Sequence, residues 1–423
     1  MTVAATSPAV KRERRRVSRF AGESPPVRYM GTKRALAPIV REALASLSPD
    51  GRVADLFSGM GSVTATLAPD YPVLANDALS FTTAFARARF LDEGGRGRPV
   101  DVARRLRPAF QECYAALCKQ FADRLRAEKQ ALAEGSESLR VYMEEAPHAG
   151  TSPEWAASAT ASRPLRRASD YRLIALYFSG AYFSTRQALE LDALRYAIDT
   201  VSDLSRDWLL SAWLAAAGAV VNAPGHVAQF LKPNGEAVYQ RVSRQWRRSI
   251  WETFVDRLGA VQPVGTRKWR AQNRVTNLDV FDLLESAEMD CVSMVYADPP
   301  YTKDQYSRFY HVYETMYMYD FPDSVGAGRY RSDRFHTTFS ALGTVRASFS
   351  DLVSRLAERG KPLVLSYPSH GALQRAHVSL SHLLRKHYHV ARNFEIMMHH
   401  STLGASSGEN QKLTREKVYV CIP

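Results

Sequence analysis

Short apolar segments that end abruptly in polar residues recur towards both ends of the chain, a pattern typical of strands buried in a parallel sheet. A helical pattern begins at Val63, soon after the first of these segments. The alternation of strand and helix predicts an α/β fold built from two separated parts of the chain. Strands are predicted at 52–56, 72–76, 292–297, 361–367 and 416–422.

The middle of the chain has a helical pattern instead. Residues 108–132 form a long amphipathic stretch, residues 239–258 predict a further helix, and the Ser/Ala/Pro-rich segment 150–168 predicts a loop. The sequence therefore predicts a catalytic domain interrupted by a helical insertion. The predicted parts are a disordered basic arm at 1–22, a catalytic domain at 23–91 and 266–423, and the insertion at 92–265.

Asp298, Pro299, Pro300 and Tyr301 directly follow the predicted strand 292–297. Because proline has no backbone N–H, the two prolines stop the sheet hydrogen bonding and fix the chain just past the strand. Ligands bind at this edge of open α/β sheets. A carboxylate and a proline carbonyl can accept both N–H bonds of an exocyclic amino group while the tyrosine stacks on the base. Taken alone, the four residues are equally compatible with a proline-rich turn.

A glycine-containing turn follows the first predicted strand, after Asp55 and Phe57. Gly59 and Gly61 let the backbone approach a ligand where a β-carbon would collide with it. The next strand ends at Asp77, and an acid in this position commonly binds a nucleotide ribose. A lone G-x-G is often only a turn, but its place between a strand and a helix favours nucleoside binding.

These motifs resemble those of a known family. The glycine turn resembles the F-x-G-x-G element of S-adenosylmethionine-dependent DNA methyltransferases, and Asp298–Tyr301 resembles the D-P-P-Y element of those that methylate adenine N6. The segment Arg28–Arg34 is similar to the N-terminal cofactor element of Dam-like adenine methylases, and the order of the elements is that of the alpha class. The resemblance covers residues 27–90 and 270–370 but not most of 92–265.

The resemblance implies a Rossmann-like class I methyltransferase sheet that uses S-adenosyl-L-methionine to methylate N6 of a flipped adenine in double-stranded DNA, with the helical insertion recognising the target. Tyr29 stands where many relatives carry Trp, and Asp55 where many carry Glu. Asp279 is expected to bind the cofactor's adenine, and Asp282 to cap the next helix. The implied cofactor-binding residues are Tyr29, Lys33, Asp55, Phe57, Gly59, Gly61, Asp77, Asp279 and Asp298, and the implied catalytic residues are Asp298, Pro299, Pro300 and Tyr301.

Two segments of the insertion carry candidate DNA contacts. The aromatic segment Tyr171–Ala197 contains Tyr182 and Arg186, and it either lines the approach to the target base or packs a helix against the sheet. The predicted helix 239–258 has a basic face that either contacts phosphates and bases or is only solvated. Its arginines are Arg241, Arg244, Arg247 and Arg248.

Aromatic residues are also dense just after the D-P-P-Y element, from Tyr306 to Tyr313. They either form the walls of a pocket for the flipped adenine or pack a helix into the core. The sequence leaves both alternatives open.

Composition agrees with an intracellular nucleic-acid enzyme. The 423-residue chain has a formal net charge of +13, which suits a polyanionic partner, and its basic arm either contacts phosphates or is a solvated tail. No apolar run is long enough to span a membrane and no signal peptide is visible, so we expect a cytoplasmic, nucleoid-associated protein. The four cysteines are interpreted as reduced thiols. Neither the cysteines nor His399 and His400 have further metal-ligating residues at a suitable spacing in the sequence, so no metal is expected.

Two rival functions remain. The same fold can methylate cytosine N4, RNA or a protein amide, and a catalytically silent chain can serve as the DNA-binding subunit of a restriction or defence complex. Asp298, in place of Ser or Asn, argues against the cytosine and amide versions, and the motif order argues against RNA. The intact motif residues argue against a silent subunit. A restriction or defence partner protein is a further expectation.

Overall fold

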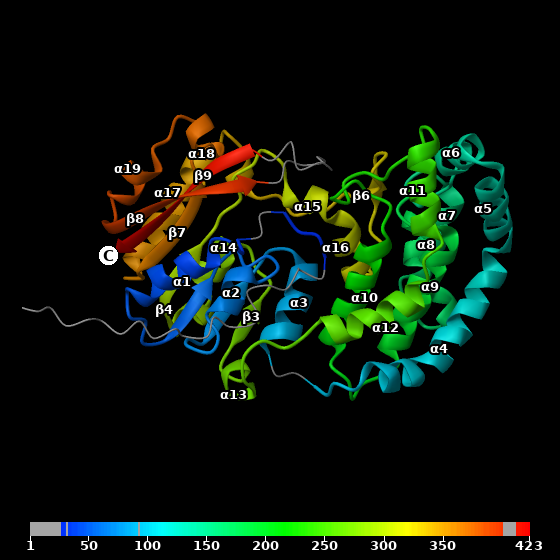
Figure 1. Ribbon diagram of the computed structural model, residues 1–423, viewed down its shortest axis with the longest axis horizontal. Coiled ribbons are helices and arrows are strands. Elements are labelled where there is room, and N and C mark those ends of the chain that lie inside the picture. Colours follow the sequence, from blue (N-terminus) through cyan, green and yellow to red (C-terminus); the bar gives the residue numbers. More distant parts are fainter. Residues whose placement is uncertain (1–26, 31–32, 92–93, 401–411) are drawn as a thin grey trace, which may run out of the picture.

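The structure is a computed structural model that describes residues 27–30, 33–91, 94–400 and 412–423, so the predicted arm at 1–22 lies outside the described residues. It confirms an α/β fold, with a seven-stranded sheet at one end of the molecule and helices at the other (Figure 1). The strand order is β3-β2-β1-β4-β7-β9-β8. The strands are β1 (Arg52–Asp55), β2 (Val73–Asn76), β3 (Arg274–Thr276), β4 (Val292–Ala297), β7 (Leu363–Pro368), β8 (His389–His400) and β9 (Lys412–Ile422).

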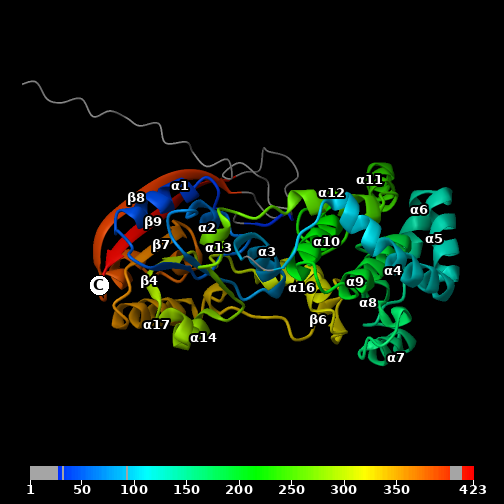
Figure 2. The ribbon, with the colours of Figure 1, turned by 90° about the horizontal axis from the view of Figure 1, so that it is seen from below.

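The central strands are buried on both faces because helices cover both sides of the sheet (Figure 2). In β1, Val53 packs into the core under α1 and α2, whereas the next residue, Ala54, packs into the core under α14 and α17. Two-sided burial explains why these strands are continuous apolar runs in the sequence. The flanking helices are α1 (Ala37–Ala45), α2 (Ser62–Thr66), α3 (Ser80–Phe90), α13 (Arg267–Arg270), α14 (Val280–Glu285), α17 (Val345–Glu358), α18 (Ala372–Arg375) and α19 (Leu380–Leu384).

The winding of the sheet reverses between β1 and β4, because the chain first adds β2 and β3 on one side and later β4 and β7 on the other. Register places Asp55 opposite Tyr296, and the Leu56 N–H donates to the Tyr296 carbonyl at 3.1 Å. The segments that leave β1 and β4 therefore begin side by side. Such a switch point is where open α/β sheets bind ligands.

The closing strand β9 runs antiparallel to β7, so β9 begins at the edge where the parallel strands end. Glu416 lies opposite Pro368 in this register. The edge strand β8, which pairs with β9, was not predicted from the sequence. Among its described side chains, Phe394 and Ile396 are half-buried while Glu395 and Met397 between and beyond them are exposed, so its apolar signal is weak.

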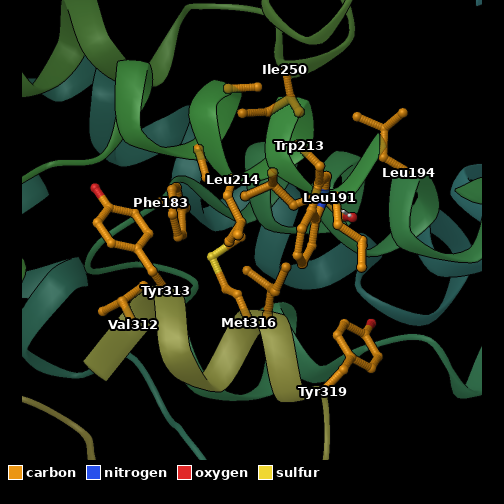
Figure 3. Packing of buried hydrophobic residues seen from close by; sticks show 14 of the residues in the cluster. Phe183, Leu191, Leu194, Trp213, Leu214, Ile250, Val312, Tyr313, Met316 and Tyr319 are labelled. Carbon is orange, nitrogen blue, oxygen red and sulfur yellow. Dashed lines mark hydrogen bonds between the residues drawn. The ribbon is translucent and has the colours of Figure 1, made fainter. Parts of the chain in front are cut away.

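Residues 99–260 are largely helical and form the other end of the molecule (Figure 1). Their core is continuous with the catalytic part: Leu191 and Trp213 pack in the same cluster as Met316, and Figure 3 shows this contact region. The helices here are α4 (Pro99–Gln120), α5 (Ala122–Glu134), α6 (Ser136–Glu144), α7 (Pro153–Ser162), α8 (Leu173–Phe178), α9 (Thr185–Asp199), α10 (Arg206–Val220), α11 (Glu236–Trp246) and α12 (Ile250–Ala260). Between the catalytic motif and α17 lie α15 (Tyr306–Phe309), α16 (His311–Met318), β5 (Ser324–Val325) and β6 (Tyr330–Arg331).

Two local predictions in this region were wrong. The predicted loop at 150–168 contains α7, because Ser152 caps it by accepting the Trp155 N–H and the Ala-rich segment that follows favours a helix. The predicted helix at 239–258 is two helices, since Ser249 starts α12 by accepting the Glu252 N–H. Arg247 and Arg248 consequently lie in the turn between α11 and α12. No helix within the described ranges is long and apolar enough to cross a membrane.

Candidate active site

The carboxyl ends of β1, β2 and β4 open into a cleft of about 990 Å³. The segments after these strands form its walls, together with the loop before α14 and residues near α15. A cleft at the switch point is the expected ligand site of an α/β fold. The cleft is lined by the predicted residues Tyr29, Lys33, Asp55, Phe57, Gly59, Asp77, Asp279, Asp298, Pro299, Pro300 and Tyr301.

The glycine turn after β1 is built around Gly59. Its φ of +50° lies in the left-handed region, and a β-carbon there would lie 3.0 Å from Cε1 of Tyr29. The Gly59 N–H donates to Oδ2 of Asp77 at 2.8 Å, and the Leu79 N–H donates to Oδ1 at 2.9 Å. Burial raises the pKa of Asp77, while these backbone donors oppose the rise. Asp77 is therefore a fixed acceptor in the wall of the cleft.

Gly61, the other glycine of the turn, is not among the residues that line the cleft. It precedes α2 with a φ of +69°, and a β-carbon there would lie 2.5 Å from the ring of Phe90. A glycine is therefore needed where the turn packs against Phe90, and the expected contact of Gly61 with the cofactor stays a prediction.

Asp55, the last residue of β1, is a buried carboxylate beside the cleft. Thr64 donates to its Oδ2 at 2.7 Å, whereas Oδ1 is buried and has no hydrogen-bond partner in the described part of the chain. Burial raises the pKa of Asp55 to about 7, against the opposing hydrogen bond from Thr64. An acceptor of this kind suits a ligand group that brings N–H donors or positive charge.

Asp298 belongs to a buried charge cluster. Lys33 Nζ lies 3.1 Å from Asp298 Oδ1 and 2.6 Å from Glu416 Oε1. Ser366 Oγ also donates to Asp298 Oδ1, at 3.0 Å, and lies 2.8 Å from the hydroxyl of Tyr296. The two described donors to Asp298 therefore meet on one carboxylate oxygen, Oδ1.

The pKa values of this cluster follow from its burial and its charges. Burial raises the pKa of Asp298 to about 6, and Lys33 opposes the rise while Glu416 adds to it. Burial disfavours the Lys33 ammonium, but Asp298 and Glu416 outweigh this effect and raise the pKa of Lys33 above its ordinary value. The Lys33 ammonium thus lies between two acidic side chains.

Tyr301 is oriented by neighbours on several sides. The Lys33 ammonium lies 5.1 Å from the centroid of its ring, and the Tyr367 ring meets it edge-on with centroids 6.4 Å apart. Burial raises the pKa of Tyr301, and a hydrogen bond with Tyr306 opposes this rise. The ring is thus held next to Asp298 in the cleft.

The aromatic segment Tyr306–Tyr313 divides between the two predicted alternatives. Tyr306 lines the cleft, whereas Tyr310 and Tyr313 are buried in the core. Tyr310 stacks on Tyr29, with centroids 4.7 Å apart, and its hydroxyl accepts the Met30 N–H at 2.7 Å. Most of this segment therefore anchors the N-terminal element that carries Tyr29 and Lys33.

Asp279 takes the capping role that was expected of Asp282. Asp279 is the N-cap of α14 and accepts the Phe281 N–H through Oδ1 at 2.9 Å. Asp282, which was predicted to be the cap, lies in the first turn of the helix instead. Asp279 also lines the cleft, so one carboxylate can both cap the helix and present an oxygen to a ligand.

Comparison with known proteins agrees with this arrangement. Residues 262–357, which include β4 and the residues after it, match the D12 class N6 adenine-specific DNA methyltransferase family. This part of the chain is thus similar to adenine-specific DNA methyltransferases. The modification methylase LlaI of Lactococcus lactis subsp. lactis is 23% identical over 340 residues, which cover 78% of this chain and 44% of that protein. The type II methyltransferase M.FokI of Planomicrobium okeanokoites is 22% identical over 358 residues, which cover 82% of this chain and 45% of that protein. The chain thus spans less than half the length of these two curated relatives.

The DNA contacts that the sequence predicts fall into two groups. Arg186 pairs with Glu190 and donates to the carbonyls of Trp246 and Arg248, so it supports the turn between α11 and α12, and its expected DNA contact stays a prediction. Arg241 and Arg248 donate to the carbonyls of Ala223 and Ala219, though both remain exposed. Arg244 and Arg247 are exposed, and no contact of theirs is seen within the described ranges. Tyr182 is fully buried, as the packing alternative predicted.

Sequence reasoning missed two residues beside the cleft, Glu416 and Ser366. Both lie in strands that were predicted, but neither belongs to a motif. The available signal was a charged residue at the start of an apolar strand, Glu416, which is fully buried. Its relevance follows only from the antiparallel direction of β9, which brings this position to the edge of the sheet that holds Asp298.

Proposed function

We propose that this chain transfers a methyl group from S-adenosyl-L-methionine to N6 of a flipped adenine in double-stranded DNA, within a restriction-modification or phage-defence system. The surroundings of Asp298 carry the proposal. Ser366 and Lys33 occupy its Oδ1, and no donor from the described residues reaches its Oδ2. A carboxylate oxygen with spare acceptor capacity beside the Tyr301 ring suits the exocyclic amino group of a base.

The chemistry requires help because the N6 lone pair of adenine is delocalised into the ring, which makes the amine a poor nucleophile. If Asp298 and the Pro299 carbonyl accept its two N–H bonds, the nitrogen is drawn towards tetrahedral geometry. The cofactor, when bound, supplies an electrophilic methyl group on a sulfonium. Positioning and electrostatics then provide most of the acceleration. Stacking on Tyr301 offsets the cost of flipping the base, which is on the order of a few kcal/mol.

The cleft offers acceptors that fit the polar groups of this cofactor. Asp77 is fixed by two backbone donors and can accept from ribose hydroxyls, and Asp279 has a second oxygen for the adenine amino group. Asp55 has a buried oxygen without a partner in the described part of the chain, which suits the ammonium of the methionine end. Tyr29 and Lys33 border the same cleft. The donor and acceptor set therefore supports S-adenosyl-L-methionine as the cofactor.

Double-stranded DNA is the proposed partner. The net charge of +13 favours a polyanion, and the names of the two relatives describe a modification methylase and a type II methyltransferase. Arg244 and Arg247 are the candidates for base or phosphate contacts in the insertion, because they are exposed and have no described partner. A nuclease or defence protein would act alongside the methylase, and action on DNA would place the chain at the nucleoid.

Methyl transfer to mixed DNA, with an isotope-labelled cofactor and nucleoside mass spectrometry, tests the proposal. Label is expected in N6-methyladenine with the wild-type protein and is expected to be lost in Asp298→Ala, which should still bind the cofactor. Asp290→Ala is the matched control, because Asp290 is 71% exposed. Label in N4-methylcytosine or only in RNA would replace the proposed substrate. Cofactor binding without any transfer would favour the silent DNA-binding subunit.

A further inference from the structure

Glu416 is a buried charge whose nearest described partner is Lys33. Its side chain is fully buried and Lys33 is only 5% exposed, and their charged atoms lie 2.6 Å apart. A buried charge is costly unless it is paired, so this pair needs a reason to persist. Glu416 is not among the residues that line the cleft, whereas Lys33 and Asp298 are. Lys33 therefore connects Glu416 to the cleft.

The antiparallel direction of β9 explains how Glu416 reaches this place. The carboxyl ends of β4 and β7 supply Asp298 and Ser366 at one edge of the sheet, and the start of β9 adds Glu416 at the same edge. Lys33 comes to this edge from the opposite end of the chain. Three distant segments thus contribute one ammonium and two carboxylates to a single buried cluster.

The formal charge of the cluster has a chemical consequence. Lys33 and Asp298 alone would form a neutral pair, and a neutral pair is a weak acceptor for an amino group. Glu416 adds a second carboxylate to the same ammonium, so the positive charge of Lys33 is shared between Glu416 and Asp298. Lys33 can then hold Asp298 Oδ1 without cancelling the charge that Asp298 presents to the cleft.

Methyl transfer moves positive charge towards this cluster. The nitrogen lone pair forms the new N–C bond, the electrons of the S–C bond leave with sulfur, and the positive charge passes from sulfur to N6. N6 then releases one proton to the Asp298 carboxylate that already accepts its N–H bond. A negative charge fixed beside the nitrogen stabilises the charge that develops there.

We propose that Glu416 is a positioning residue for the transfer: it holds the Lys33 ammonium and offsets its charge, so that Asp298 is oriented yet remains a fully charged acceptor. This inference rests on the proposed function. A merely structural glutamate would anchor β9 and leave the chemistry of Asp298 unchanged.

Glu416→Gln is the main test, because it removes the charge and keeps an oxygen that can accept from Lys33. We expect kcat to fall about tenfold or more, the loss typical of removing a charge-assisted interaction. The cofactor Kd and the KM for DNA should remain within about twofold of the wild-type values, since Glu416 is not part of the cleft wall. The matched control is Glu395→Gln, because Glu395 pairs with Lys417 at the exposed face of the neighbouring strand.

The pH profile separates positioning from anchoring. Glu416 raises the pKa of Asp298, so its neutralisation should lower that pKa and move the acidic limb of kcat to lower pH. An anchoring role would lower stability without moving this limb. The ionisable groups that act on Asp298 or are affected by it include Lys33, Glu416, Asp55, Tyr29, Tyr296, Tyr301 and Tyr306, and Glu416→Gln leaves all but Glu416 in place.

A second measurement, the rate at which Lys33 is acylated, does not depend on methyl transfer. Acetic anhydride acylates the neutral amine form of lysine, and Glu416 helps raise the pKa of Lys33, so Lys33 should react slowly in the wild-type protein. Mass spectrometry should show faster acylation of Lys33 in Glu416→Gln and an unchanged rate in Glu395→Gln. Should Glu416→Gln not fold, Glu416→Asp serves instead, because its carboxylate lies one methylene further from Lys33, which should raise acylation and lower kcat.

Failure of the inference differs from failure of the proposed function. Wild-type kcat, an unmoved acidic limb and an unchanged Lys33 acylation rate in the variant would overturn the role of Glu416. A higher kcat in Glu416→Gln would also overturn it, since Lys33 would then be an obstacle that Glu416 holds in place. A wild-type protein that methylates no nucleic acid would refute the proposed function instead, whatever the acylation of Lys33 shows.

Discussion

The Gly59 N–H donates to Asp77 Oδ2 at 2.8 Å, so the residue that turns the chain after β1 also orients the carboxylate at the end of β2. The two strands are neighbours in the sheet, and the bond joins their carboxyl ends across the cleft edge. The glycine turn and the acid, which the sequence presents as separate motifs, are therefore one structural unit. This unit leads to the first two predictions.

Asp77→Ala should weaken cofactor binding by about tenfold or more, because a hydrogen bond to a charged acceptor contributes roughly 1.5–3 kcal/mol. Isothermal titration calorimetry with S-adenosyl-L-methionine measures the change. The variant must first be shown to be folded, since Gly59 and Leu79 also lose their acceptor. An unchanged Kd in a folded variant would contradict the assignment of Asp77 to the cofactor.

Gly59→Ala should destabilise the protein by about 1–2 kcal/mol, the cost of placing a non-glycine residue in the left-handed region. The added methyl group would also lie 3.0 Å from the ring of Tyr29, which must shift. Urea unfolding measures the free energy. Gly343→Ala is the control, because a β-carbon there meets nothing within 4 Å, and equal effects at both positions would remove the argument from backbone conformation.

Tyr301→Phe should keep much of the activity, whereas Tyr301→Ala should chiefly raise the KM for DNA. The two variants should differ because the rings of tyrosine and phenylalanine can both stack on the base, whereas alanine cannot. Stacking of a base on an aromatic ring contributes about 1–3 kcal/mol. Steady-state kinetics on methylatable DNA distinguish the two variants. Equal losses in both would mean that the hydroxyl, which interacts with Tyr306, matters more than the ring.

Asp55 should make the stability of the protein without cofactor depend on pH. Burial raises its pKa from 3.8 to about 7, so the folded protein holds a proton that the unfolded chain releases. This contribution is complete below pH 3.8 and is lost as the pH rises through about 7. Asp55→Asn, which does not titrate, should therefore gain in stability relative to the wild type as the pH rises from 5 to 8.

Urea unfolding of both proteins at the two pH values provides the measurement. The same substitution at Asp290, which is 71% exposed, should leave the difference from wild type constant. A gain for Asp55→Asn at low pH only would reverse the predicted sign.

Arg244 and Arg247 should contribute to DNA binding more than Arg186 does, because Arg186 is engaged by Glu190 and by two carbonyls. An alanine substitution that removes a base contact should cost about 1–3 kcal/mol on the preferred site and little on random DNA. Binding curves on methylatable and scrambled duplexes measure this. An equal proportional loss of affinity on both duplexes would identify phosphate contacts. If neither substitution lowers the affinity for DNA, these two arginines do not belong to the interface.

The central sheet could be predicted because its strands are buried on both faces and therefore appear as apolar runs. The segment 292–297 is observed as β4 with the same bounds, and the cleft forms where the D-P-P-Y element follows it. The edge strand β8 could not be predicted in this way, since only alternate residues such as Phe394 and Ile396 are partly buried and charged residues separate them.

The predictions for the helical part were wrong where a single capping side chain determines the residue at which a helix begins. Ser249 divides a single basic periodicity into two helices, and Ser152 converts a loop-like composition into the start of α7. Asp279 and Asp282 are three residues apart and both suit a cap, so only the chain direction after β3 selects between them. Glu416 required knowledge of strand direction, which no local pattern contains.

The place of Glu416 in β9 has a consequence for synthesis. Translation delivers Lys33 first, Asp298 much later and Glu416 last of the three, and domains assemble as their segments leave the ribosome. A nascent chain that already contains β4 and β7 has an open sheet edge and lacks the third charge of the cluster. The complete cluster should accordingly form only when β9 docks against β7, so we expect chains that have not yet added this strand to lack methyl transfer.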